Sequence, residues 1–347
     1  MFYIHQTSCI SPQRTFGDID IDTLQDPVDK KFYAIEPSYE GIPPGVLRRM
    51  GKAVRMGVGA AMPLLKDTAA PDGIIIGTAT GGKEDCIKFL DQIVKYDEGM
   101  LTPVNFVQST PNAVAAQVSL LTKNRGYNIT HLQIGLAFEF AVIDADMMLT
   151  ENPGNSYLLG AVDDISINNY YFEDKGGWYK KEEVTAATFY EANSPGSLAG
   201  EAACMFLVNG TETGCIAKVE AIDTLHGSEE SAVKEKLQDF ISKHLPAGET
   251  IDLLLTGENG DNRLLNYYSS CESVVNDSVT IARFKHMSGE YPTATGMGLW
   301  LGCHILQHQS IPAHMVKKPG AATKYKNILI YNTYKGRQHS FMLLAGA

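Results

Sequence analysis

Apolar runs alternate along the chain with longer segments whose apolar residues recur at helical spacing. Residues 73–82 and 251–262 each begin as a short apolar run and end in a glycine-containing turn. Such runs are typical of buried strands in an α/β sheet. Residues 47–67 and 231–245 have a helical period, and the first of them carries small residues that would let another element pack closely.

The stretch at residues 126–164 has the most distinctive pattern. It predicts a strand at 128–134, a sharp bend at Gly135, an apolar helix at 136–149 and a second strand at 157–162. Many enzymes hold a nucleophile where a strand bends into a helix, because the first helical N–H groups favour an anion and lower a thiol pKa. Gly135 carries no nucleophile, so the pattern predicts the strand, bend and helix but no nucleophilic catalysis at the bend.

The second half of the chain repeats the order of the first. Each half reads as β-α-β-α-β-α-β-β and closes on two adjacent strands. This order predicts a duplicated α/β fold, layered αβαβα with two mixed sheets, divided into residues 1–211 and 212–347. Residues 166–195 are polar and aromatic and are expected to form an excursion from the first half.

Composition narrows the possible partners. The net charge of -11 argues against nucleic acid or an anionic membrane surface. No run of about 18 apolar residues predicts a membrane span, and the first ten residues do not resemble a signal peptide. The six cysteines are scattered without a CxxC pair, which suits a reducing cytoplasm.

No cofactor or metal is expected. His304 and His308 have the i, i+4 spacing of some metal sites, but no third ligand is evident. The glycines of residues 77–82 form neither a GxGxxG motif nor a P-loop, and residues 196–200 are not a GxSxG elbow. The acidic residues that follow the bend, Glu139, Asp144 and Asp146, are expected to form a polar face at a dimer seam. The alternative for Glu139, which is two places from Ala137 on the apolar side, is that it enters a pocket or an interface.

A collinear series of motifs resembles the β-ketoacyl-acyl-carrier-protein synthases, which have the thiolase-like fold. Arg48-Arg49-Met50 is similar to an RRM-containing helix start, and Lys285 with Gly289 stands in the place of a KSxxGH motif. Gly126 and Asn128 occupy the place of a GPN motif. Three further segments are similar to the family's GVxxGTGxGG, PNxAAGxIS and LGEGAG motifs: residues 73–82, 111–120 and 199–203.

The departures from the family are as specific as the matches. Condensing enzymes use a cysteine thiolate, together with two histidines that stabilise developing negative charge. The resemblance places Gly135 at the cysteine position and Thr256 and Glu290 at the two histidine positions, with Lys285 retained. The family's closing GFGG turn falls at residues 335–338. Chain-length factors of polyketide synthesis carry glutamine in place of the cysteine, whereas Gln133 lies two residues earlier.

The resemblance implies three alternatives. The leading one is a catalytically degenerate, chain-length-factor-like subunit in fatty acid, polyketide or polyene biosynthesis. It would pair with an active ketosynthase around the third strand of the first half, shape the tunnel for an acyl chain and meet an acyl carrier protein. The second is an enzyme with altered acyl-transfer, hydrolytic or decarboxylating chemistry that uses Glu290, Lys285 and Thr256. The third is a homodimeric binder of acyl chains or carrier protein.

An acidic carrier protein needs a local basic surface on a chain whose net charge is negative. Four basic residues near the first predicted helix form the candidate basic patch. They are Arg48, Arg49, Lys52 and Arg55.

Overall fold

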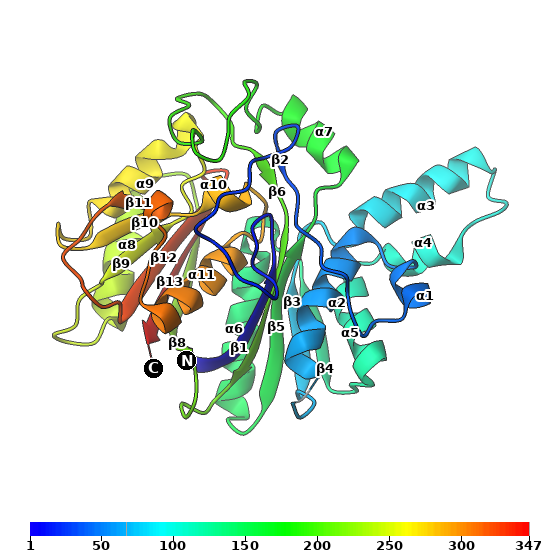
Figure 1. Ribbon diagram of the computed structural model, residues 1–347, viewed down its shortest axis with the longest axis horizontal. Coiled ribbons are helices and arrows are strands. Elements are labelled where there is room, and N and C mark those ends of the chain that lie inside the picture. The colour runs from blue at the N-terminus through cyan, green and yellow to red at the C-terminus, as the bar shows by residue number, and fades with distance from the viewer. Residues whose placement is uncertain (67, 347) are drawn as a thin grey trace.

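A large mixed sheet runs through the computed structural model, which describes residues 1–66 and 68–346 (Figure 1). Within these residues eleven strands are hydrogen-bonded in the order β11-β10-β9-β12-β13-β8-β1-β7-β5-β3-β4. Two short strands, β2 (Lys31–Phe32) and β6 (Ala199–Gly200), pair separately. Asp67 and Ala347, the predicted last residues of one helix and of the final strand, lie outside the described residues.

The strands of the two halves follow one plan, as the repeated order in the sequence predicted. In the first half β3 is parallel to β4 and β5, and β7 is antiparallel to β5 and β1. In the second half β9 is parallel to β10 and β12, and β13 is antiparallel to β12 and β8. The division at residues 211 and 212 stays a prediction.

The bounds of these strands are as follows. The first half contains β1 (Phe2–Ile10), β3 (Gly73–Gly77), β4 (Tyr127–His131), β5 (Ser156–Asp163) and β7 (Ala202–Asn209). The second half contains β8 (Ala217–His226), β9 (Leu253–Thr256), β10 (Thr280–Arg283), β11 (Val316–Lys318), β12 (Asn327–Tyr334) and β13 (Gln338–Gly346).

Two apolar helices form the central layer. Helix α6 (Ala137–Glu151) packs on β3, β5 and β8, and α11 (Thr295–His308) packs on β12, β1 and β7, so each contacts strands of both halves. This arrangement confirms the layered α/β fold. The two predicted sheets meet at one edge, where β1 and β8 pair over three residue pairs and join them into one.

The outer helices cover the remaining faces. Helices α2 (Lys52–Leu65) and α5 (Ala113–Thr122) pack on the first half, and α8 (Glu230–His244) packs on the second beside α9 (Leu265–Glu272) (Figure 1). A Cβ on Gly57 would lie 2.5 Å from a methyl group of Val114, which confirms that the small residues of α2 permit close packing. Short helix α1 (Pro44–Leu47) precedes α2.

One predicted helix start is wrong. Arg48-Arg49-Met50 was expected to open the first long helix, but these residues lie between α1 and α2, and α2 begins after Gly51. Gly51 has an extended ψ of 164°, so it ends the helical conformation at that point. Helices α3 (Lys83–Lys95) and α4 (Pro103–Gln108) project from the first half in Figure 1.

Candidate functional site

The bend before α6 is displaced by one residue from its predicted position. Strand β4 ends at His131, a 3₁₀ turn covers Ile134–Leu136, and the residue with a left-handed backbone is Ile134, at φ 54°. A β-branched residue in this region is strained, and such strain persists only where the surroundings enforce it. The prediction that Gly135 forms the bend is therefore corrected: Ile134 takes the strain and Gly135 follows it.

Gly135 is buried beneath the aromatic side chain of Tyr334. A Cβ on Gly135 would lie 2.3 Å from the Cβ of Tyr334, so the space of a nucleophile side chain is already filled. The amide N–H of Gly135 donates to Oε1 of Gln338 at 2.9 Å, and Nε2 of Gln338 donates to the carbonyl of Gln133 at 3.1 Å. The N–H that would favour an anion is therefore already paired with a side chain of the same chain.

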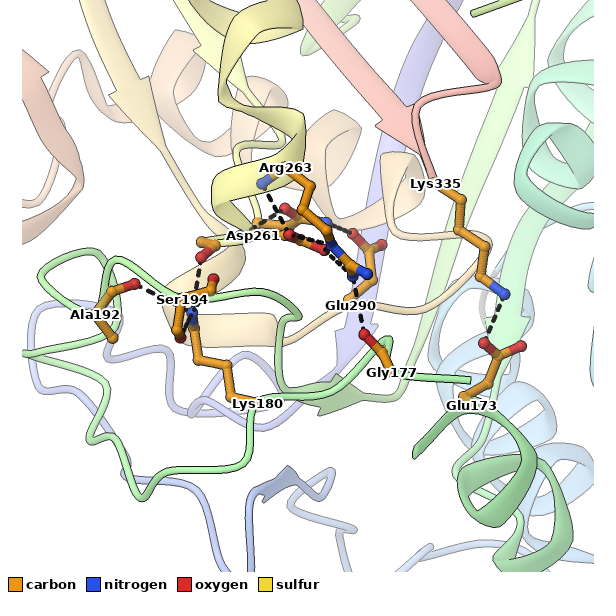
Figure 2. Close-up of polar contacts among 11 residues, drawn as sticks. Glu173, Gly177, Lys180, Ala192, Ser194, Asp261, Arg263, Glu290 and Lys335 are labelled. Atoms are coloured by element: carbon orange, nitrogen blue, oxygen red, sulfur yellow. Dashed lines mark hydrogen bonds and ion pairs between the residues drawn. The ribbon is translucent and has the colours of Figure 1, made fainter. Parts of the chain in front are cut away.

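The turn between β12 and β13 supplies both of these side chains. Lys335 and Gly336 have φ of 55° and 65°, and the Arg337 N–H donates to the Tyr334 carbonyl, which is the geometry of a type I′ hairpin turn. Lys335 extends from this turn to Glu173 on α7 (Ile167–Lys175), with Nζ and Oε2 2.6 Å apart. Figure 2 shows these two side chains pointing toward each other.

Lys285 and Glu290 form a closed ion pair. Lys285 is fully buried, and its Nζ lies 2.5 Å from Oε1 of Glu290. Oε2 of Glu290 accepts from Nδ2 of Asn259 at 2.7 Å. Both carboxylate oxygens are thus engaged, so Glu290 is poorly placed to remove a proton from a substrate.

Thr256 does not join this pair. It is fully buried at the end of β9, and its hydroxyl has no hydrogen-bond partner among the described residues. Asn259, three residues later, makes the contact with Glu290 instead. Sequence reasoning missed Asn259 because the length of the turn after a strand does not reveal which of its side chains points inward.

Two cationic side chains, Lys180 and Arg263, hold the excursion at residues 166–195 in place over the site (Figure 2). The buried ammonium of Lys180 donates to the carbonyls of Ala192, Ser194 and Gly260. Arg263 pairs with Asp261 and donates to the carbonyl of Gly177 at 2.9 Å. These contacts join the excursion to the turn after β9.

Asp163, the last residue of β5, joins the two halves beside the site. Its Oδ1 accepts from the N–H groups of Ala79 and Thr80 and from the hydroxyls of Thr78 and Thr80. Its Oδ2 accepts from the N–H and hydroxyl of Thr293, ahead of α11. Six donors therefore hold one buried carboxylate.

The adjacent Asp164 has a different environment. Its side chain lines a pocket and receives no hydrogen bond among the described residues, although only 8% of it is exposed. Burial raises its pKa to about 7, and the neighbouring carboxylates of Glu201 and Asp163 act in the same direction. Two aspartates directly after the predicted apolar strand are a sequence signal for a polar edge of the sheet. They belong to none of the motifs compared with the family, so sequence reasoning missed them.

Two hollows lie around Tyr334 and Lys335 and share part of their lining. The inner pocket is lined by Asp164, Glu173, Asp261 and Glu290 and by the rings of Tyr179 and Tyr291, among others. The outer cleft is lined by basic and apolar groups, including Lys83, Ile134, His226 and Arg337. Tyr334, Lys335 and Glu173 line both hollows, so the hairpin turn divides them.

Glu139 lies inside the protein rather than on the polar face predicted for it. It is fully buried in α6, and neither carboxyl oxygen has a hydrogen-bond partner in the described part of the chain. Burial raises its pKa, while the nearby Thr295 and Ser340 hydroxyls oppose the shift. Asp144 on the same helix instead accepts a hydrogen bond from Tyr127 at 3.2 Å.

Two kinds of site are not found in residues 1–66 and 68–346. No group of three histidine, cysteine or acidic side chains is placed to hold a metal ion. No helix in this part of the chain has the length and apolarity needed to cross a bilayer.

Comparison with known families agrees with the fold. A model of the beta-ketoacyl synthase N-terminal domain matches residues 26–236, more than half of the chain. The chain therefore belongs to the beta-ketoacyl synthase family. No curated protein sequence matches it.

Several solved structures share the fold over the whole chain. A beta-ketoacyl synthase from Burkholderia phymatum STM815 has a TM-score of 0.78 at 12% identity, over 100% of this chain and 99% of that chain. The ishigamide ketosynthase/chain length factor has the same TM-score, identity and coverage. A type II polyketide synthase ketosynthase in complex with its acyl-carrier protein, AntDE:AntF, has a TM-score of 0.79 at 11% identity, over 100% and 99%. At these identities the likeness shows the fold alone.

Placing a cysteine at Gly135, where the resemblance puts the family's nucleophile, is expected to destabilise the protein. Gly135→Cys should lower the free energy of unfolding by about 1–3 kcal/mol, because its side chain would overlap Tyr334. Urea unfolding at equilibrium measures this change. Adding Tyr334→Ala to the same chain makes room, so the double variant should lose less stability than the sum of the two single losses.

Gly154→Cys is the matched control for that experiment. Gly154 lies in the exposed loop after α6, and a Cβ there would meet no atom within 4 Å. Its unfolding free energy should stay within about 0.5 kcal/mol of the natural chain. Equal stability of the Gly135→Cys and Gly154→Cys variants would show that Tyr334 does not fill the nucleophile position.

Proposed function

We propose that this chain is a non-catalytic subunit of the chain-length-factor kind. It pairs with a catalytically intact ketosynthase and helps to shape the space for an acyl chain delivered by an acyl carrier protein. The observation that carries the proposal is the filled position at Gly135, where Tyr334 occupies the side-chain space and Gln338 pairs with the amide. A condensing enzyme needs this space for the side chain of its nucleophilic cysteine.

The charge of the inner pocket supports the same role. Condensation on a malonyl thioester needs cationic or hydrogen-bond-donating groups that stabilise an enolate and an oxyanion. Here Lys285 is neutralised by Glu290, and Asp164, Glu173 and Asp261 also line the pocket. A negatively charged transition state would gain little stabilisation among these carboxylates. The alternative of altered acyl chemistry at Glu290, Lys285 and Thr256 is therefore the weaker candidate.

The edge of the first half offers a surface for a partner. Strand β4 pairs with β3 on one side only, so its other edge has unpaired backbone groups. Leu132 and Ile134 directly after it are 48% and 55% exposed. The projecting helices α3 and α4 and the loop between them also expose Val94, Met100 and Phe106. Exposed apolar side chains of this kind support a contact with a partner chain.

The basic patch predicted for a carrier protein is smaller than the sequence suggested. Lys52 is paired with the buried carboxylate of Glu201, and Arg55 is paired with Glu36 at 2.6 Å. Arg48 and Arg49 are exposed ahead of α2 and have no ion pair among the described residues. We therefore assign the carrier contact to Arg48 and Arg49.

Co-expression tests the pairing. The chain is produced with a ketosynthase encoded next to it that retains cysteine and both histidines, and the tagged chain is purified. We expect a stable heterodimer that the Leu132→Asp variant reduces at least tenfold, because a buried charge would replace an interface leucine. Leu265→Asp is the control, since Leu265 is 36% exposed on α9, on the far side of the molecule from α3 (Figure 1).

Three results decide among the alternatives. Failure to pair with every neighbouring ketosynthase counts against the subunit role, and a homodimer sensitive to Leu132→Asp favours the binder. Turnover of acyl- or malonyl-carrier protein by the purified chain, abolished by Glu290→Gln, establishes the altered enzyme.

A further inference from the structure

Of the four acidic side chains that line the inner pocket, Asp164, Glu173, Asp261 and Glu290, three are ion-paired. Glu173 pairs with Lys335, Asp261 with Arg263, and Glu290 with Lys285. Asp164 has no such partner among the described residues and receives no hydrogen bond there through its carboxyl group. A buried carboxylate without a counter-ion is costly, so this position favours any cation that can reach it.

The surroundings of Asp164 do not supply that cation. The positive charge of Lys52 acts to lower the pKa of Asp164, but its ammonium is paired with Glu201. Glu201 is itself saturated, because it also accepts from the N–H groups of Ala34 and Ile165. Asp163 is held by six donors, as described above. Asp164 is thus the one carboxyl of this acidic group that is both unpaired and directed to the pocket.

The pocket is small and shares part of its lining with the larger outer cleft. Its volume is about 50 Å³, room for a few water molecules or for the ammonium end of a small molecule. The rings of Tyr179, Tyr291 and Tyr334 line it. Beyond Tyr334 lies the outer cleft of about 360 Å³, which can hold the rest of such a molecule.

We propose that the inner pocket binds a small organic cation whose primary ammonium group pairs with Asp164, with an alkyl portion directed to the outer cleft. This ligand is chemically distinct from a malonyl or acyl group, and the site does not depend on the subunit role proposed above. An ammonium would make the fourth ion pair and restore the charge balance of the pocket.

The site makes binding depend on pH. Burial raises the pKa of Asp164 to about 7, with Glu201, Asp163 and Glu84 acting in the same direction and Lys52 opposing them. An alkylammonium binds the ionised carboxylate, whose fraction rises from about one tenth at pH 6 to about nine tenths at pH 8. Affinity should therefore rise about tenfold over this range.

Other charged groups also line the two hollows, so the pH experiment needs a control variant. Glu173, Glu290, Asp261 and Lys335 line the pocket and are ion-paired. His226 lines the outer cleft. Asp164→Asn removes only the contribution of Asp164, so it shows whether this carboxyl group causes the pH dependence.

Isothermal titration calorimetry with n-butylammonium chloride tests the proposal on the full chain. We expect saturable binding at pH 8, at least tenfold tighter than that of n-butanol or butyrate, and about tenfold weaker at pH 6. Asp164→Asn should reduce affinity at least tenfold and abolish the pH dependence. Asp239→Asn, at an exposed position of α8, should leave both unchanged.

The Asp164→Asn variant is expected to remain folded, because it removes an unpaired buried charge. Its melting temperature checks this. Equal affinity for n-butylammonium and n-butanol would overturn the proposal, as would the absence of saturable binding. A folded Asp164→Asn variant that binds as tightly as the natural chain would also overturn it.

Discussion

Replacing Asp163 by asparagine is expected to lower the free energy of unfolding by about 3–5 kcal/mol. The carboxylate of Asp163 accepts six hydrogen bonds from the loop after β3 and from Thr293 ahead of α11. An asparagine can keep one oxygen in place, but its NH₂ group would then face the N–H and hydroxyl of Thr293. Urea unfolding followed by far-ultraviolet circular dichroism measures the loss.

The neighbouring aspartate is the matched control, because the same substitution there should act in the opposite direction. The raised pKa of Asp164 means that its ionised form destabilises the folded state. This cost is absent below the unfolded pKa, near pH 4, and is fully developed above pH 7. Asp164→Asn should therefore stabilise the protein at pH 8 by roughly 1–4 kcal/mol and have little effect at pH 4.

Two outcomes would contradict this account of the aspartate pair. One is an Asp163→Asn variant that unfolds at the same urea concentration as the natural chain. The other is an Asp164→Asn substitution whose effect on the free energy of unfolding is less favourable at pH 8 than at pH 4. Either result would mean that the hydrogen bonds of Asp163 and the unpaired state of Asp164 do not govern their stability effects.

The repeated fold could be predicted because its signals are local. Apolar runs such as β3 and β9 end in glycine turns, and both halves use the same element order. The joining of the two sheets was not predictable in this way. It rests on three residue pairs between β1 and β8, which lie more than 200 residues apart in the chain.

The candidate site was predicted only in part for the same reason. Lys285 and Glu290 are five residues apart, so their motif was readable, and the structure brings them together. The contact of Gly135 with Tyr334 joins residues about 200 positions apart and depends on the docking of the β12–β13 hairpin. The sequence could therefore show that Gly135 has no side chain to act as a nucleophile, but it could not show that Tyr334 fills the adjacent space.

The second large effect on stability is expected when the buried ion pair of Lys285 and Glu290 is broken. Lys285→Met is expected to lower the free energy of unfolding by about 3–5 kcal/mol, because it leaves Glu290 charged in a pocket already lined by Asp164, Glu173 and Asp261. Asn259 would be its remaining hydrogen-bond partner. The double variant Lys285→Met, Glu290→Gln removes both charges and should recover to within about 2 kcal/mol of the natural chain.

Lys335→Met controls for the loss of a lysine from an ion pair of similar geometry. Lys335 and Glu173 are 2.6 Å apart, but each side chain is 25% exposed, so water screens the pair. Its loss should cost no more than about 1 kcal/mol. If Lys285→Met costs as little as Lys335→Met, Glu290 does not depend on its buried lysine. If it is costly and Glu290→Gln restores stability, the two residues form a structural charge pair at the place where the resemblance puts one of the family's histidines.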